Sequence, residues 1–559
     1  MNNVWLENYP EGVPHEIDPG AFDSIVEVFE RSVRHYPNRP AFSNLGATLS
    51  YSQIDRLSLD FAAYCQKRLD LGKGDRLAIM MPNLLQYPVV LFGALRAGLA
   101  VVNTNPLYTA RELRHQLSDS GTRAIVILEN FASVLESCLD DTPVETVILT
   151  RMGDMLPFPK SLIVNAVVKH VKKMVPAYRL PEARAFKEIL REGDAIDFDP
   201  PSVQSDDIAF LQYTGGTTGV SKGAVLTHRN MIANMLQAGA WIEDHVEKGE
   251  EVVITALPLY HIFALTANCL VFSAIGGLNH LITNPRDMPG FVRELGKTHF
   301  TAITGVNTLF NGLLNTPGFE DLDFRSLKIA LGGGMSVQRD VAERWKRVTG
   351  CTLVEAYGLT EAAPAVCINL VDLEEFNGSV GLPVPSSECR VQDDHGNVLA
   401  FDEVGELYVR GPQVMKEYWN RPDETRECLS PDGWLRTGDI ATMDEKGFVR
   451  IVDRKKDMIV VSGFNVYPGE LEDIVAMHPG VLEVGAIGVE DPRAGEAVKL
   501  VVVRKDADLS VESLQEHCRK NLTAYKCPRH IQFVDSLPKS NVGKILRREL
   551  RALYGSPTS

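Results

Sequence analysis

The chain has 559 residues, which is too long for a single hydrophobic core, so at least two domains are expected. Its apolar content of 45% is ordinary for a globular protein, and its net charge of -16 argues against a nucleic-acid partner, which needs a basic face. Nine cysteines without a C-x-x-C pair, and an N-terminus without signal-peptide features, predict a cytoplasmic protein.

The N-terminal region alternates predicted helices with predicted strands. Apolar residues at helical spacing predict a helix over 21–36, and Ser50 opens a second helix that runs to about Lys67. Strands separated by helices favour βαβ units and a mainly parallel sheet, so the predicted fold class is α/β. The predicted strands are 76–81, 100–103 and 124–128.

A proline-bounded segment from Met155 to Tyr178 resembles an insertion, and the helical wheel of residues 161–175 is two-sided. The pattern is typical of an interfacial helix on an anionic membrane, and equally of a surface helix packed on its own domain. Both readings stay open at this stage, although the segment is too short and too charged to span a bilayer. One arc holds Ile163, Val164, Val167, Val168, Val171, Met174 and Val175, and the other holds Asn165, Lys169, Lys172 and Lys173.

A loop rich in glycine and hydroxyl groups is predicted between a strand at 207–213 and another at 224–226. Glycines let backbone N–H groups approach an anion, and hydroxyls and a lysine add donors and positive charge. The loop therefore predicts a polyphosphate cradle, with a flexible surface turn as the alternative, and its spacing is not that of a Walker A loop. The residues that carry this pattern are Thr214, Gly215, Gly216, Thr217, Thr218, Gly219, Ser221, Lys222 and Gly223.

Thr227 is the predicted N-cap of the next helix, which begins near His228. Residues 252–285 contain no Asp, Glu, Lys or Arg and could be mistaken for a membrane span. Proline, histidine, asparagine and glycine interrupt this stretch, and β-branched runs within it favour strands. We therefore expect it to form buried domain core.

Two blocks carry groups suited to a nucleotide. Glycines 332–334 follow a predicted strand and would let a flat ring lie against the backbone, although such a triplet also suits a tight turn. In the block 355–361, Tyr357 can stack on a purine and Thr360 can bind a phosphate. Glu361 is an oxygen ligand suited to Mg²⁺. A core tyrosine and a solvated glutamate are the alternatives.

Further along, Asp439 offers two acceptor oxygens for a ribose diol, and Arg454 could reach ribose or phosphate. A turn aspartate and a solvated basic run are the alternatives here. The sequence changes character near Asp453, and a smaller α/β unit is predicted beyond it. The predicted domains are 1–455 and 456–559.

These motifs, in this order, resemble the superfamily of adenylate-forming enzymes, which includes acyl-CoA synthetases, beetle luciferases and peptide-synthetase adenylation domains. The block 432–456 resembles the signature of fatty acyl-CoA synthetases most specifically. The resemblance implies a large N-terminal domain of stacked α/β sheets with a β-barrel-like part. It also implies a small mobile α+β C-terminal domain that rotates about a hinge near Lys456.

The resemblance also implies roles for individual residues. Lys544, Glu361 and Thr214 would be catalytic, with Glu361 as the metal ligand. His261 and Gly305 would lie in the acyl site, and Ser462, Gly463 and Phe464 in a CoA tunnel. The implied ATP and AMP site comprises Thr214, Gly215, Gly216, Thr217, Thr218, Gly219, Lys222, Gly332, Gly333, Gly334, Tyr357, Gly358, Thr360, Asp439 and Arg454.

The chain is most similar to bacterial long-chain fatty acid–CoA ligases. That likeness implies that a fatty acid, ATP and CoA are substrates, that Mg²⁺ is a cofactor, and that an acyl-adenylate is the intermediate. The alternatives are a medium-chain or aryl-CoA ligase, a peptide-synthetase adenylation domain, and a catalytically silent lipid-binding or transport protein. Peripheral contact with the inner face of the cytoplasmic membrane through residues 161–175, and a homodimer, are further open readings.

Overall fold

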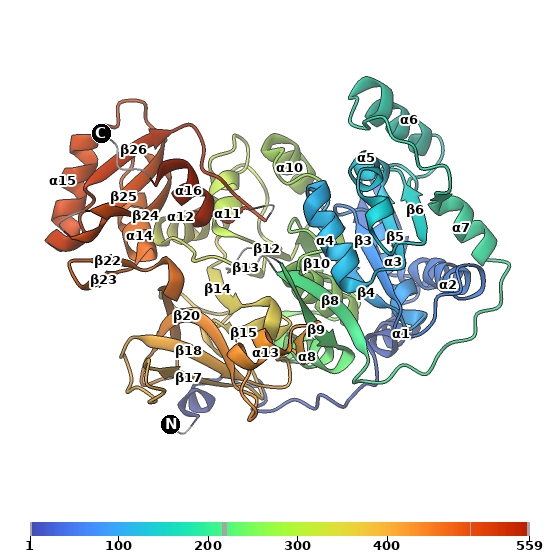
Figure 1. Cartoon of the computed structure of the whole chain (residues 1–559), viewed down its shortest axis with the longest axis horizontal. Coiled ribbons are helices and arrows are strands. Elements are labelled where there is room, and N and C mark those ends of the chain that lie inside the picture. The colour runs from blue at the N-terminus through green and yellow to red at the C-terminus, as the bar shows by residue number, and fades with distance from the viewer. Residues whose placement is uncertain (1–2, 215–220, 492–493, 541, 556–559) are drawn as a thin grey trace.

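The computed structural model describes residues 3–214, 221–491, 494–540 and 542–555. A large N-terminal domain contains three sheets and a smaller C-terminal domain contains one, counted over these residues (Figure 1). The predicted α/β fold class is confirmed.

An eight-stranded sheet forms the part of the large domain that contains the predicted N-terminal strands. Its strand order is β19-β9-β8-β4-β3-β5-β6-β7, and the strands from β8 to β7 run parallel. Helices cover both faces of this parallel region, so its central strands are buried. The strands are β3 (Arg76–Met80), β4 (Ala100–Asn103), β5 (Ala124–Leu128), β6 (Thr146–Thr150), β7 (Arg184–Ala185), β8 (Ile208–Thr214), β9 (Lys222–Thr227) and β19 (Glu417–Tyr418).

A nine-stranded sheet lies beside it, in the order β16-β15-β14-β13-β12-β10-β11-β1-β2. Its middle strands are parallel, so the carboxyl ends of β12, β13 and β14 meet at one edge. The uncharged stretch 252–285 supplies β10 and β11 of this sheet, as expected of domain core, and no helix in the described ranges is long and apolar enough to cross a membrane. The strands are β1 (Pro40–Asn44), β2 (Ala47–Ser50), β10 (Val252–Thr255), β11 (Leu278–Leu281), β12 (Ala302–Gly305), β13 (Ile329–Gly333), β14 (Leu353–Gly358), β15 (Ala365–Ile368) and β16 (Leu382–Pro383).

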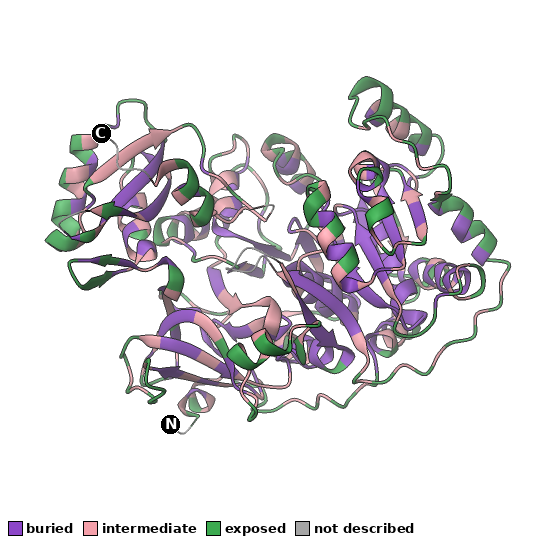
Figure 2. Ribbon diagram, viewed as in Figure 1, coloured by how far each residue is buried: buried purple, intermediate pink, exposed green. Residues whose placement is uncertain are grey.

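The expected barrel-like part is an antiparallel sheet of β17 (Glu388–Gln392), β18 (Gly405–Arg410), β20 (Leu435–Met443) and β21 (Val449–Arg454). Its last two strands align Asp439 with Arg454. The C-terminal domain has a separate sheet and its own hydrophobic core, distinct from the core of the large domain (Figure 2). Its strands are β22 (Ile459–Val461), β23 (Phe464–Val466), β24 (Val481–Asp491), β25 (Gly495–Arg504) and β26 (His530–Val534).

Helix starts follow the local capping signals. Ser50 and Thr227 each form a capping box at the helix that the sequence predicts there. In the N-terminal part of the chain the helices are α1 (Ile25–His35), α2 (Tyr51–Arg68), α3 (Gln86–Arg96), α4 (Ala110–Ser120), α5 (Ala132–Glu136), α6 (Lys160–Ala166), α7 (Phe186–Gly193) and α8 (His228–Ile242). The later helices are α9 (Val271–Ala274), α10 (Met288–Leu295), α11 (Asn307–Leu314), α12 (Arg339–Thr349), α13 (Pro422–Cys428), α14 (Pro468–Ala476), α15 (Val511–Asn521) and α16 (Arg547–Tyr554).

The two-sided segment is helical, because α6 continues into a π-helical turn, Val167–Val171. It stands away from the body of the large domain (Figure 1). Asn165 and Lys169 of its polar arc contact the domain, whereas Lys172 and Lys173 are exposed. The Nζ of Lys169 lies 2.7 Å from Oε1 of buried Glu129, and Asn165 accepts a hydrogen bond from the Gly153 amide. Its exposed apolar side chains are Leu162, Ile163, Val171 and Met174, and exposed Phe158 lies just before it. Within the apolar arc, Val168 is buried and Val164, Val167 and Val175 are half-buried, whereas Ile163, Val171 and Met174 are exposed. The arc therefore packs on the domain only in part.

Candidate active site

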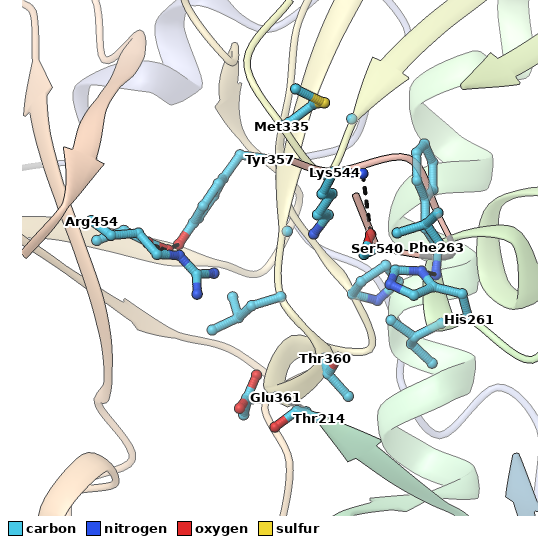
Figure 3. Close-up of a pocket in the computed structure, with 18 of the residues that line it drawn as sticks. Thr214, His261, Phe263, Met335, Tyr357, Thr360, Glu361, Arg454, Ser540 and Lys544 are labelled. Atoms are coloured by element: carbon cyan, nitrogen blue, oxygen red, sulfur yellow. Dashed lines mark hydrogen bonds and ion pairs between the residues drawn. The ribbon is translucent and has the colours of Figure 1, made fainter. Parts of the chain in front are cut away.

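A cavity of about 2670 Å³ lies between the large domain and the C-terminal domain. It opens at the carboxyl ends of β13 and β14, where ligands of parallel α/β sheets usually bind. A loop of the C-terminal domain around Lys544 enters it from the other side (Figure 3). Segments from both domains therefore build one site.

The end of β13 forms one wall. Gly334 has a φ of +79°, and a Cβ there would lie 3.0 Å from Cε of Lys544. A Cβ on Gly333 would lie 3.0 Å from the ring of Phe263. These two glycines thus let a cation and a ring approach the backbone. Gly332 is different, because its Cβ would meet Val337 at 2.5 Å and the residue does not line the cavity.

Tyr357, Asp439 and Arg454 form a connected group on a second wall. The Tyr357 hydroxyl donates to Oδ2 of Asp439 at 2.6 Å, and Nε of Arg454 lies 3.2 Å from Oδ1. Burial and the neighbouring Asp439 carboxylate raise the pKa of Tyr357 well above its usual value, so the phenol stays a donor. Strand pairing brings Asp439 and Arg454 together, and the end of β14 adds Tyr357. Gly358 follows on the same cavity wall.

Glu361 lies with Thr214 and Thr360 at the opposite end of the site (Figure 3). The Tyr418 hydroxyl donates to Oε1 of Glu361 at 2.6 Å. The Nζ of Lys222 lies 5.3 Å from the centre of the Tyr418 ring. Sequence reasoning missed Tyr418, which belongs to the short edge strand β19 and carries no motif. A carboxylate has several acceptor positions, so this one bond leaves capacity for another ligand.

The structure describes only part of the predicted phosphate loop. Thr214 and Lys222 pair across β8 and β9, and both line the cavity. Gly215, Gly216, Thr217, Thr218 and Gly219 lie outside the described residues.

Lys544 projects from the C-terminal domain toward the glycine wall (Figure 3). Its amide donates to Oγ of Ser540 at 3.1 Å, and Thr308 of the large domain donates to the Gly543 carbonyl at 2.9 Å. Burial, and then the positive charge of Arg454, lower the pKa of Lys544 to about 8. The fold therefore holds this cation where its charge is costly in the absence of an anion.

His261 lies near Lys544 (Figure 3). Burial and the charge of Lys544 lower the pKa of His261 to about 3, so its imidazole is neutral. Its Nδ1 accepts from the Phe263 amide at 3.3 Å. Gly305 is buried at the end of β12, where a Cβ would lie 2.9 Å from Leu309 and Phe310. It does not line the cavity, so tight packing explains this glycine.

An apolar arm of the cavity runs along the nine-stranded sheet. Ile329 and Gly333 mark the two ends of β13 along it, about 13 Å apart at the rise of a strand. The opposite side includes α8 and a π-helical turn, Ala264–Leu270, that precedes α9. No motif marks this arm in the sequence, because its members come from six separate elements and from the segments between them. They include Ala238, Ile242, Phe263, Ala267, Val271, Phe272, Ala302, Ile329, Leu331, Ile368 and Val371.

The residues assigned to a CoA tunnel do not line the cavity. Ser462 and Gly463 connect β22 and β23, and Phe464 begins β23. The Phe464 side chain is 57% exposed and stacks on Tyr525 with ring centres 4.9 Å apart. Lys456, the predicted hinge, lies in a short 3₁₀ turn, Lys455–Asp457, and does line the cavity.

The side chains around Glu361 suit a metal ion that is bound jointly by the protein and by a substrate. No cluster of three or more His, Cys, Asp or Glu side chains that could hold a metal occurs in the part of the chain that the structure describes. Mg²⁺ commonly takes one or two carboxylates together with substrate phosphates. Glu361, beside Thr214 and Thr360, fits that arrangement.

Strand ends, a glycine wall and a lysine supplied by a second domain are features of a nucleotide-binding enzyme. The chain belongs to the AMP-binding enzyme family, whose model matches residues 29–419, and the model of the AMP-binding enzyme C-terminal domain matches residues 470–544. The suspected adenylate-forming family is thus confirmed.

Individual relatives agree with the family. The chain is 59% identical over 551 residues to a long-chain-fatty-acid–CoA ligase of Escherichia coli O157:H7, covering 99% of this chain and 98% of that protein. It is 52% identical over 556 residues to a long-chain-fatty-acid–CoA ligase of Haemophilus influenzae, with coverage of 99% and 98%. Among solved structures, ATP-bound MatB from Rhodopseudomonas palustris superposes with a TM-score of 0.78 at 27% identity, covering 96% of this chain and 99% of that one.

Proposed function

We propose that this protein is a long-chain fatty acid–CoA ligase. A fatty carboxylate oxygen attacks the α-phosphorus of ATP, pyrophosphate leaves, and an acyl-adenylate forms. The thiolate of CoA then attacks the acyl carbon, and AMP leaves. The apolar arm carries the proposal, because it offers an uncharged channel that extends from the neighbourhood of Lys544 and His261 along β13.

The positions in the cavity support the proposed residue roles. Tyr357 and the glycine wall hold adenine, and Asp439 with Arg454 binds the ribose. Thr214, Thr360 and Lys222 face the phosphates. Lys544 bridges the carboxylate and the α-phosphate, and its charge offsets the negative charge that develops as they react.

Glu361 is the protein ligand proposed for Mg²⁺. When bound, the metal supplies positive charge that neutralises phosphate oxygens. The hydrogen bond from Tyr418 keeps the Glu361 carboxylate oriented toward that position.

The second half-reaction requires a different orientation of the C-terminal domain. In the structure Lys544 occupies the cavity, whereas Phe464 lies on the outside. We propose domains 1–455 and 456–559 with a hinge at Lys456, about which Ser462, Gly463 and Phe464 turn toward the site to form the CoA tunnel.

We also propose that residues 161–175, called the α6 segment below, contact the membrane from which the poorly soluble fatty acid is taken. Its exposed apolar side chains point away from the domain, and Lys172 and Lys173 are exposed along it. That combination favours insertion at an anionic surface.

Acyl-CoA formation over a ladder of acids from hexanoate to oleate tests the proposed function. We expect the highest kcat/KM with the long acids. Ala238 lines the apolar arm from α8, and Ala240 on the same helix does not. Ala238→Phe should lower activity with long acids by about tenfold or more, because one or two lost methylene positions are worth that factor. Ala240→Phe is the matched control.

The same ladder decides between the proposal and its rivals. A maximum at the medium-chain acids in the native enzyme would assign it to a medium-chain ligase, and higher activity with benzoate than with any acid of the ladder would assign it to an aryl-CoA ligase. No ATP–pyrophosphate exchange with any acid would leave only a lipid-binding or transport role.

A further inference from the structure

Arg547 begins α16, three positions after Lys544, and is ion-paired on both sides of the hinge. Its Nη1 lies 2.6 Å from Oδ1 of Asp453, which precedes the hinge. Its Nη2 and Nε lie 2.7 and 3.1 Å from the two carboxylate oxygens of Glu472, which follows the hinge on α14. One guanidinium thus connects a strand of the large domain to a helix of the small one.

Asp453 makes a second contact across the hinge. Its Oδ2 accepts from the Gly469 amide at 2.7 Å, in the first turn of α14. A carboxylate at a helix N-terminus satisfies a free amide and interacts favourably with the helix dipole. The Asp453 side chain is only 2% exposed, so water screens these contacts weakly.

We infer that Asp453 and Arg547 are positioning residues for the adenylate-forming half-reaction. Their ion pair holds the C-terminal domain in the orientation that places Lys544 against the glycine wall. Residues on opposite sides of Lys456 cannot keep these contacts if the small domain turns about it, so the pair favours one orientation over the other. The inference rests on the proposed two-step function.

A nearby ion pair supplies a control. Lys526 lies 2.6 Å from Glu470, which is also on α14, and both residues follow the hinge. Removing this pair changes the charge of the same helix without touching a contact to the large domain. In the same way, Asp453→Asn leaves Arg547 paired with Glu472 inside the small domain.

The test measures the two half-reactions separately in the full-length enzyme. ATP–pyrophosphate exchange reports adenylation, and CoA-dependent consumption of preformed acyl-adenylate reports thioester formation. We expect Asp453→Asn and Arg547→Gln each to slow adenylation by about tenfold or more, because the productive orientation becomes less populated. Thioester formation should stay within about twofold of the native rate or increase. Glu470→Gln should leave both rates unchanged.

A double variant sharpens the result. If the pair acts as one contact, Asp453→Asn with Arg547→Gln should slow adenylation no more than the more severe single change. Equal loss of both half-reactions in the Asp453→Asn enzyme, or no loss in either, would overturn the inference while native activity upholds the proposed function. A native enzyme inactive with every acid would instead refute the function itself.

Discussion

Lys544 shows how this site holds a charged side chain in an environment with little access to water. Lys544 is a buried cation, and the carboxylates of Asp439 and Glu361 only partly offset the effect of burial and Arg454 on its pKa. Such tuning makes the charge available to an incoming anion at little cost in reorganisation.

The first prediction concerns pH. Because the pKa of Lys544 is lowered to about 8, its charge is present below that pH and is lost as pH rises through it. The kcat/KM of adenylation should therefore fall about tenfold for each pH unit above this value, since it reports the free enzyme. Pyrophosphate exchange against pH measures it. Lys544→Ala should be much slower and lack this alkaline decline, while thioester formation from preformed acyl-adenylate is largely spared. An unchanged decline in that variant would assign the titration to another group.

The second prediction separates two acidic residues. Glu361→Ala and Asp439→Ala should each slow adenylation by about tenfold or more, as expected when a group that binds the transition state is lost. Only Glu361→Ala should raise the Mg²⁺ concentration needed for half-maximal exchange. Tyr418→Phe removes the hydrogen bond to Glu361 but keeps the carboxylate. The Mg²⁺ concentration that this variant needs should therefore lie between those of the native enzyme and of Glu361→Ala. Identical Mg²⁺ titrations for native and Glu361→Ala enzymes would remove Glu361 from the metal site.

At the scale of elements, the α6 segment shows that packing, and not the helical wheel alone, determines which positions of a helix are exposed. The wheel separates apolar from polar positions, but the packing follows neither arc, because Lys169 of the polar arc is ion-paired with buried Glu129 and Val168 of the apolar arc is buried. Leu162, Ile163 and Val171 are 61%, 57% and 73% exposed.

The third prediction follows from that orientation. Changing Leu162, Ile163 and Val171 to Gln should weaken binding to anionic liposomes by more than about tenfold, because each buried apolar side chain is worth roughly 1.5–3 kcal/mol. Lys172→Glu with Lys173→Glu should weaken it further and more strongly at low salt, at about 1 kcal/mol for each lysine. Co-sedimentation measures both. Activity with a short, soluble acid should not change, and unaltered co-sedimentation of the triple variant would place the membrane contact elsewhere.

At the scale of the whole molecule, the relation of the two domains determines which chemistry is available. The Gly543 carbonyl accepts from Thr308, and the Leu482 carbonyl accepts from Asn311 at 3.2 Å, so the small domain rests on α11. We propose that this orientation serves adenylation, because it brings Lys544 against Gly334 in the cavity.

The fourth prediction tests the hinge. Lys456→Pro restricts φ near -65°, a value compatible with the 3₁₀ turn in this structure. Adenylation should survive within about threefold, whereas thioester formation should slow by about tenfold or more, because it needs a different φ at the hinge. Rapid-quench measurement of each half-reaction checks this. Equal loss of both would leave the hinge assignment without support, and the Asp453→Asn enzyme should show the reverse pattern.

Local chemistry was enough to predict much of the molecule. Hydrophobic periodicity predicted the parallel strands, side-chain capping predicted the starts of α2 and α8, and short motifs indicated Thr214, Tyr357, Glu361 and Asp439 as binding residues, all of which line the cavity. Each of these features depends on a few neighbouring residues, so it can be recognised in the sequence without knowledge of the fold. Lys544, which also lines the cavity, was indicated by the family resemblance rather than by local chemistry.

What the sequence by itself determined was therefore the family, the elements and the residue types of the site. Only the tertiary structure decided which distant groups meet. Tyr357 and Asp439 are 82 positions apart and Asp453 and Arg547 are 94 apart, so no local pattern connects them. The apolar arm, the burial of Gly305 and the outward face of α6 arise in the same way, because burial and charge pairing depend on surroundings that only the packed chain provides.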